Sequence, residues 1–308
     1  MKTCPLCASG AVIPANEAYS LDEIFAMWAR SGIQFSATVR AEHAYAERVA
    51  LYECDFCQLG MFDPPIAGSP RFYEELQEQA GAWYYLADKW EFRHARGDLR
   101  GCRSVLEIGC GDGRFLRESL DQAGVERAVG TEYNAASIEK ARQRGVEVTA
   151  SSLANLEEKY PEGFDAVCAF QVLEHVDTPV EFLQSVRRLL RPGGIALFGV
   201  PNNGGLIRFT KPYLHDLPPH HLTRWCEATF RRGVERLGFQ VQAVHFEPLA
   251  HYHYGWLFPL WLQYEVKLPG ARFIRPLVSR GARVFKWLGF KHLNFIRGHT
   301  VYVKLRAV

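Results

Sequence analysis

The stretch SVLEIGCGDGRFLRESL, residues 104–120, joins an apolar run, three closely spaced glycines and a helical segment. The apolar run predicts a short strand, and the residues after the glycines predict a helix. Gly109, Gly111 and Gly113 allow the backbone to turn tightly and to approach a ligand closely. A strand, a glycine turn and a helix in this order predict a βα unit with a ligand at the carboxyl end of the strand.

Three classes of ligand use such a turn, and two of them do not fit these residues. A phosphate-binding P-loop needs Gly-Lys-Ser/Thr at the helix start, and no such lysine is present. A dinucleotide fold needs a third glycine where this chain has Arg114, and it brings pyrophosphate to the strand end, where Glu107 would repel it. An acid there favours a cationic ligand, and S-adenosylmethionine (SAM) carries a sulfonium and an ammonium but no phosphate. Glu132, at the end of the next predicted strand, could accept both ribose hydroxyls, although NAD-binding proteins use an acid in the same way.

The pattern continues beyond this unit. The chain contains seven candidate strands, at residues 104–108, 127–131, 146–149, 164–170, 195–200, 239–246 and 300–305. Helical segments separate the first six, which predicts an α/β fold with a parallel, doubly wound sheet. The last candidate alternates apolar and polar residues, which is typical of a terminal or antiparallel strand.

Four motifs, VLEIGCGDGRFL, GTEYN, FDAVCAFQVLEHVDTP and LLRPGGIALFGVPN, resemble in order and spacing those of the class I SAM-dependent methyltransferases. The resemblance covers residues 70–305, approximately. It implies a Rossmann-like, doubly wound seven-stranded sheet of order 3-2-1-4-5-7-6, with the last strand antiparallel. The cofactor-binding residues that it implies are Glu107, Gly109 and Gly111 for the methionine part, Glu132 for the ribose, and Phe170 and Gln171 beside the cofactor. No residue is assigned to the adenine, because the stretch after the third strand lacks the aspartate that is frequent there.

Two Cys-x-x-Cys pairs, Cys4 with Cys7 and Cys54 with Cys57, lie before this region. Four thiolates with this spacing suit a structural Zn²⁺ ion, while redox pairs and unconnected thiols remain alternatives. The phrase CDFCQLGMFDPP resembles the second knuckle of the N-terminal zinc-binding domain in sugar C-methyltransferases. A zinc knuckle also precedes the catalytic domain of certain rRNA guanine methyltransferases, so an RNA acceptor stays open.

Between the two pairs, Ser20 with Glu23 three residues later predicts a capped helix. We expect a small zinc-binding unit over residues 1–65 and a methyltransferase domain over residues 66–308. The second unit contains an aromatic and basic helical insertion at residues 247–298.

Two adjacent histidines, His220 and His221, follow two prolines in LPPHHLTRW, residues 217–225. The surrounding segment resembles one in sugar and small-molecule methyltransferases, which lies over the cofactor. In sugar C-methyltransferases a Glu-His pair stands there and the histidine is the base; by position, His221 matches that histidine and His220 replaces the glutamate. A loop-orienting role is the alternative for the pair. His175 is a second catalytic candidate, with a structural tie between helix and loop as its alternative, and Trp83, Tyr84 and Tyr85 are candidates for a lid or for core aromatics.

The net charge of +2 gives no reason to expect a dedicated nucleic-acid binder. After Glu265, however, the chain has ten Lys and Arg residues and no Asp or Glu. This tail could contact an anionic membrane surface, cover the acceptor site, or pack with a solvated basic face. No apolar run is long enough for a transmembrane helix or a signal peptide, so we expect a cytoplasmic protein that could lie at the membrane surface.

These observations predict a SAM-dependent methyltransferase that acts on a sugar or another small metabolite, including a lipid-carried one. Nucleic acid is not the expected partner. Two other functions remain open at this point. An RNA methyltransferase is consistent with the cysteine pairs and the basic tail, and a protein that binds SAM without turnover is consistent with the glycine turn.

Overall fold

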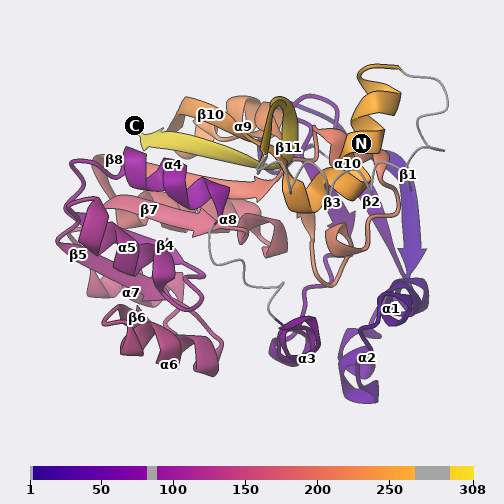
Figure 1. Ribbon diagram of the computed structural model, residues 1–308, viewed down its shortest axis with the longest axis horizontal. Helices are drawn as coiled ribbons and strands as arrows, with labels where there is room; N and C mark the ends of the chain where they lie inside the picture. Colours follow the sequence, from indigo (N-terminus) through magenta and orange to yellow (C-terminus); the bar gives the residue numbers. More distant parts are fainter. Residues whose placement is uncertain (1–2, 82–88, 268–291) are drawn as a thin grey trace.

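The computed structural model describes residues 3–81, 89–267 and 292–308, and within them the chain forms two sheets (Figure 1). The larger sheet has seven strands: β4 (Ser104–Ile108), β5 (Arg127–Thr131), β6 (Glu147–Thr149), β7 (Phe164–Phe170), β8 (Leu190–Pro201), β10 (Phe239–Ala250) and β11 (His292–Ala307). Their order is β10-β11-β8-β7-β4-β5-β6. β4 pairs in parallel with β5 and β7, whereas β11 pairs antiparallel with both β8 and β10. If the seven strands are numbered 1 to 7 along the chain and read from β6 to β10, their order is 3-2-1-4-5-7-6, with strand 7 (β11) antiparallel to its neighbours. This order confirms the predicted fold class.

Helices cover both faces of this sheet, because alternate residues of each strand point to opposite sides. One face packs against α7 (Leu153–Lys159), α8 (Pro179–Leu189) and α9 (Glu227–Gly233). The other face packs against α4 (Trp90–Asp98), α5 (Arg114–Gln122) and α6 (Ala135–Gln143). In β4, for example, Leu106 joins the first core and Val105 the second. The carboxyl ends of the central strands therefore remain as the edge where a ligand can bind.

The smaller sheet belongs mainly to the N-terminal part of the chain. Its strands lie in the order β1 (Val12–Ser20), β2 (Arg48–Cys54), β3 (Gly60–Asp63) and β9 (Thr223–Arg224). Three helices accompany it: α1 (Leu21–Arg30), α2 (Ala37–His43) and α3 (Pro70–Ala80). Ser20 and Glu23 form the capping box that the sequence predicts at the start of α1. The fourth strand comes from the segment after β8, so the smaller sheet is completed by residues far along the chain.

The predicted helical insertion at 247–298 is strand at both of its ends among the described residues, because β10 continues to Ala250 and β11 begins at His292. Both strands extend into it as an antiparallel ribbon, in which Leu249 lies opposite Leu293. The 3-10 turn η6 (His251–His253) and α10 (Tyr254–Tyr264) follow β10, and α10 packs on Leu206 and Ile207 after β8. Apolar residues of the ribbon join this small core, which explains why strand geometry continues. Residues 268–291, with six of the ten basic residues of the tail, lie outside the described residues, as do Trp83, Tyr84 and Tyr85. Among the helices that the structure describes, none has the length and apolar character needed to span a bilayer.

Candidate functional site

The glycine turn between β4 and α5 has the backbone conformation that its sequence predicts. Gly109, Gly111 and Gly113 have φ angles of +70°, +53° and +73°, which residues other than glycine rarely adopt. A Cβ atom at Gly109 would lie 2.7 Å from Val172 Cγ2, so the turn also needs the absence of a side chain there. The turn thus presents backbone to the carboxyl edge of the sheet.

Glu107 lies in β4 directly before this turn and is 2% exposed. Its Oε2 atom has no hydrogen-bond partner among the residues that the structure describes. Burial raises the pKa of Glu107 well above its usual range, and the nearby Lys89 only partly opposes that shift. A buried carboxyl without a donor is costly on its own, so it suits a ligand that supplies positive charge or N–H donors.

Glu132 follows β5, and three backbone groups orient its carboxylate. Oε1 accepts hydrogen bonds from the N–H groups of Tyr133 and Asn134 at 2.7 and 2.9 Å, and Oε2 accepts one from Gly111 at 3.0 Å. A carboxylate offers about four lone pairs, so little accepting capacity remains for two ribose hydroxyls unless a backbone contact is shared. The structure nevertheless brings Glu132 and the glycine turn together at one edge of the sheet.

Phe170 and Gln171 lie at the end of β7, as predicted. The Phe170 ring is buried and packs edge-on against Phe92 and Phe115, so it is a core ring. Gln171 has a φ angle of +59°, and its Nε2 donates to Glu91 Oε1 at 3.2 Å. A positive φ in a residue other than glycine is uncommon and frequently marks a functional position.

His175, His220 and His221 lie together, although 45 residues separate the first from the second in sequence. The ring centroids of His175 and His220 are 4.9 Å apart, and those of His175 and His221 are 4.7 Å apart. His175 belongs to the 3-10 turn η2 (Leu173–His175) after β7, and its Nδ1 donates to the His220 carbonyl at 2.6 Å. His220 Nδ1 donates in turn to the carbonyl of His215 at 2.8 Å. The first of these hydrogen bonds ties His220 to the turn that follows β7.

Burial keeps these imidazoles neutral. It lowers the pKa of His175 to about 3, and it holds the pKa values of His220 and His221 well below their usual range. Glu174 lies beside them, 1% exposed, with its Oε1 3.9 Å from His175 Nε2 and 4.0 Å from His221 Nε2. Burial raises the pKa of Glu174 to about 8. At neutral pH the three rings are therefore uncharged, and the carboxyl group of Glu174 is largely protonated.

The ring nitrogens of the three histidines lie within 4.8 Å of one another, a spacing at which a metal ion could be considered. The His220 and His221 rings, however, stack at 4.4 Å with only 16° between their planes. A metal ion lies close to the plane of each imidazole that binds it, and two stacked, nearly parallel rings share no such point. This arrangement therefore suits proton transfer better than joint binding of one ion.

A protein-family model described as "Methyltransferase domain" matches residues 72–244. The chain belongs to this methyltransferase family. The family confirms what the four sequence motifs predict, and it covers the glycine turn and all three histidines of the cluster.

Individual proteins similar to this methyltransferase chain are also named methyltransferases. A probable S-adenosylmethionine-dependent methyltransferase of Mycolicibacterium smegmatis is 34% identical over 143 residues, which are 46% of this chain and 53% of that protein. A ubiquinone biosynthesis O-methyltransferase of Neisseria meningitidis is 29% identical over 161 residues, 49% of this chain and 65% of its own length. The match thus spans between half and two thirds of these curated relatives. A solved SAM-dependent methyltransferase of Archaeoglobus fulgidus shares the fold, with a TM-score of 0.51 at 18% identity over 76% of this chain and 99% of that one.

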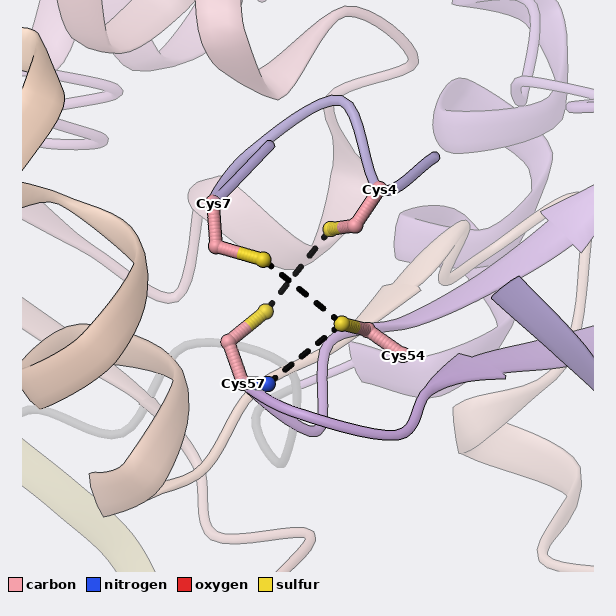
Figure 2. Close-up of side chains that lie close together, drawn as sticks. All are labelled: Cys4, Cys7, Cys54 and Cys57. Atoms are coloured by element: carbon pink, nitrogen blue, oxygen red, sulfur yellow. Dashed lines mark hydrogen bonds between the residues drawn. The ribbon is translucent and has the colours of Figure 1, made fainter. Parts of the chain in front are cut away.

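The four cysteines of the N-terminal part of this methyltransferase converge on one point (Figure 2). Sγ of Cys4 lies 3.7 Å from that of Cys57, and Sγ of Cys7 lies 3.7 Å from that of Cys54. These distances are far longer than a disulfide bond of about 2.05 Å. Four sulfurs at about 2.3 Å from a tetrahedral Zn²⁺ ion are about 3.8 Å apart, so the observed spacing fits such an ion.

The surroundings of the four sulfurs are consistent with this geometry. The backbone N–H groups of Gly10 and Cys57 point at Cys7 and Cys54 Sγ, both at 3.4 Å. A Cβ at Gly10 would lie 2.3 Å from Cys54 Sγ, so glycine is needed there. The hydrogen bond from the Cys57 thiol lowers the pKa of Cys4 to about 5, and the same contact raises the pKa of Cys57. The group thus releases its first proton readily, as a metal site must.

Three acidic residues of the site are not predicted above: Glu174, which lies inside one of the four motifs without an assigned role, and Asp216 and Glu17, which lie outside them. Asp216 lies 3.2 Å from His221 Nδ1, and Glu17 pairs with Arg224 three residues after His221. Glu174 and Asp216 lie within five residues of a candidate histidine in sequence, which is too common a pattern to identify them, and Glu17 lies near none. A cavity of about 630 Å³ between the segment after β8, α9 and α10 contains none of the predicted site residues.

Proposed function

We propose that this protein transfers a methyl group from SAM to a small-molecule acceptor. The observation that carries the proposal is the buried Glu107 directly before the glycine turn, whose Oε2 has no hydrogen-bond partner among the described residues, in a chain of the methyltransferase family. A carboxyl there repels phosphate and attracts the ammonium and sulfonium of SAM. SAM supplies an activated methyl group, so the protein has to align the acceptor and remove its proton.

In this proposal the methionine part of SAM lies against Glu107, Gly109 and Gly111. Glu132 serves the ribose, and the end of β7 at Phe170 and Gln171 borders the cofactor. The support is that all six residues lie at the carboxyl edge of β4, β5 and β7.

His221 is the proposed base on the acceptor side. Its Nδ1 faces the Asp216 carboxylate, so the proton of the neutral ring lies on Nδ1 and Nε2 can accept one. SAM would supply the methyl group: the acceptor O–H, N–H or C–H would give its proton to Nε2, its electron pair would bond to the methyl carbon, and the S–C electron pair would stay on sulfur. His175 and His220 are proposed to hold the loop that contains His221 and to position the acceptor.

The proposed acceptor is a sugar or another small metabolite, including one that a lipid carries. Relatives from Neisseria meningitidis and Proteus mirabilis are named ubiquinone biosynthesis O-methyltransferases, which supports a small-molecule acceptor. RNA is a weaker candidate because the net charge is only +2. A SAM-binding protein without turnover would lack a reason for a neutral histidine cluster next to the cofactor edge.

The four-cysteine group is proposed to hold a structural Zn²⁺ ion. With four protein sulfurs the ion would have no open position, so its role is to stabilise the N-terminal unit. Eight free cysteines also suit a reducing compartment, which is the basis for proposing a cytoplasmic location. The basic tail is the basis for proposing peripheral contact with anionic membranes, which salt-sensitive sedimentation with anionic but not neutral vesicles would support.

Calorimetry with SAM and its demethylated product, followed by SAM-consumption assays with a panel of sugars and small metabolites, tests the main proposal. We expect binding of both compounds and turnover with part of the panel. Tight binding of NADH without binding of SAM would contradict the cofactor assignment, and SAM binding without turnover on any acceptor, RNA included, would favour a binding protein.

A further inference from the structure

A series of buried charged groups connects His221 with the N-terminal sheet. His221 Nδ1 lies 3.2 Å from Asp216 Oδ1, while Asp216 Oδ2 accepts a hydrogen bond from Asn203 Nδ2 at 2.7 Å. Arg224 Nε lies 2.8 Å from the same Oδ2, an ion pair whose N–H is not aligned for a hydrogen bond. The two terminal nitrogens of Arg224 donate to the two carboxylate oxygens of Glu17, at 3.0 and 3.2 Å. Arg224 is thus shared between a carboxylate of the base loop and a carboxylate of the N-terminal unit.

The local structure of β1 turns Glu17 toward this arginine. The pairing of β1 with β2 shifts register between Pro14 and Ala18, and Asn16 inside the bulge has a φ angle of +55°. Bulges of this kind re-aim side chains at functional positions, and asparagine tolerates the left-handed conformation. The Glu17 side chain is consequently only 8% exposed, and Lys211 forms a second ion pair with it.

The backbone fixes the other end of the series. Arg224 pairs with Gly60 in the antiparallel contact between β9 and β3, where a Cβ on Gly60 would lie 3.0 Å from Arg224 Cβ. Leu222 donates its N–H to the Glu174 carbonyl at 2.8 Å. The loop that carries His221 is therefore held between the N-terminal sheet on one side and the turn after β7 on the other.

The charges of Asp216 and Arg224 are buried, so the stability of each charged form depends on the oppositely charged partner. Asp216 is 4% exposed and Arg224 is 5% exposed. Burial raises the pKa of Asp216, and Arg224 and Asn203 oppose that shift. Loss of one partner leaves the other charge buried and uncompensated, which changes the position or protonation of the remaining groups.

We propose that Asp216 is a positioning residue that holds His221 with its proton on Nδ1, and that Glu17 of the N-terminal unit supports Asp216 through Arg224. The N-terminal unit then serves the acceptor-side base instead of binding a separate partner such as RNA. This inference rests on the role of His221 proposed above. The titratable and charged groups that face His221 are Asp216, His215 and His220 from its own segment, Glu174 and His175 from η2, His299 from β11, and Arg224 from β9.

The test compares three variants of the full-length protein with the parent. Asp216→Asn and Glu17→Gln remove one charge each with almost no change of shape, and Glu47→Gln is a matched control on an exposed glutamate of the same unit. Imidazole ¹⁵N NMR reports which ring nitrogen of His221 carries the proton, with its signals assigned by their loss in His221→Ala. Turnover, the Kd of SAM and the melting temperature are measured in parallel.

We expect the parent and Glu47→Gln to show the Nδ1–H form of His221, and both other variants to gain the Nε2–H form. Glu17→Gln should lower kcat roughly 2- to 30-fold, the range of coupling through such networks, with the Kd of SAM unchanged. If Asp216→Asn is too unstable to purify, the NMR and turnover measurements on Glu17→Gln alone are sufficient for the test. Unchanged NMR signals in Glu17→Gln, or a loss of SAM binding in step with activity, would overturn the inference. The NMR result is obtained without an acceptor, so failure of the proposed methyl transfer would be recognised separately.

Discussion

Glu107 is the residue on which the proposed choice of cofactor depends, because it combines burial with a carboxyl oxygen that has no hydrogen-bond partner among the described residues. Replacing Glu107 by Gln keeps the shape and removes the negative charge. A hydrogen bond to a charged group contributes about 1.5–3 kcal/mol, so we predict SAM binding about 10- to 150-fold weaker. Calorimetry checks this value, and Glu118→Gln, at a partly exposed acid of α5, is the control. Equal SAM affinity in Glu107→Gln and the parent would remove the main support for a cationic ligand.

His221 is the residue on which turnover depends in the proposed mechanism. General bases typically contribute 10²–10⁴-fold, so His221→Ala should lower kcat by about that factor while the Kd of SAM stays nearly constant. His220→Ala should have a smaller effect, through acceptor position. Turnover assays at saturating acceptor give the answer. Near-normal turnover in His221→Ala would show that the stacked pair is structural.

At the scale of single elements, the strands of the large sheet follow from local patterns. β4, β5 and β7 begin and end where their apolar runs do, because both faces of a central strand are buried. β9 could not be predicted in this way. It has two residues, and it exists only because Arg224 lies opposite Gly60, which is far away in sequence.

We expect the stability of the N-terminal sheet to depend on the four cysteines. We predict one Zn²⁺ ion per chain, because the four sulfurs have tetrahedral spacing. Cys54→Ser should lose the ion and lower the melting temperature, and a chelator should destabilise the parent in the same way, since metal binding contributes folding energy in such sites. Elemental analysis and thermal unfolding measure both effects.

Cys102→Ser is the matched control for this prediction, because Cys102 is a free cysteine outside the four-sulfur group. It should keep the full zinc content. Protein purified without chelator that contains no metal would contradict the assignment.

At the scale of the whole molecule, the candidate site was predictable wherever chemistry is tied to a motif. The glycine turn, the cysteine pairs and the adjacent histidines each carry a sequence signal, and folding brings the members of each group together. Glu174, Asp216 and Glu17 were not predictable. Their importance comes from burial and from contacts between residues that are 5 to 207 positions apart, such as Asp216 with His221 and Glu17 with Arg224. Burial and such contacts cannot be recognised before the fold is known.

Four titratable groups with shifted pKa values predict a narrow pH range of maximal stability. The pKa values of Glu174 and Glu247 are raised from 4.5 to about 8 and about 7, so their contribution is full below pH 4.5 and is lost as the pH rises through the raised values. The pKa values of His175 and His299 are lowered from 6.5 to about 3 and about 4, so their contribution is full above pH 6.5 and is lost as the pH falls. The melting temperature should therefore be highest between pH 4.5 and 6.5.

Thermal unfolding across pH 4 to 9 measures this dependence, and Glu174→Gln should reduce the decline on the alkaline side. A melting temperature that rises steadily to pH 9 in the parent would contradict the prediction.

The pairing of the short strand β9 with β3 also determines when the smaller sheet can be completed during translation. β3 ends at Asp63, but its partner Arg224 leaves the ribosome only about 160 residues later. At a translation rate of about 5–20 residues per second, that interval is roughly 8 to 32 s. During this time β3 is an open sheet edge, which is a template for pairing with other chains. The nascent N-terminal unit therefore keeps this open edge until the segment that contains Arg224 has been made.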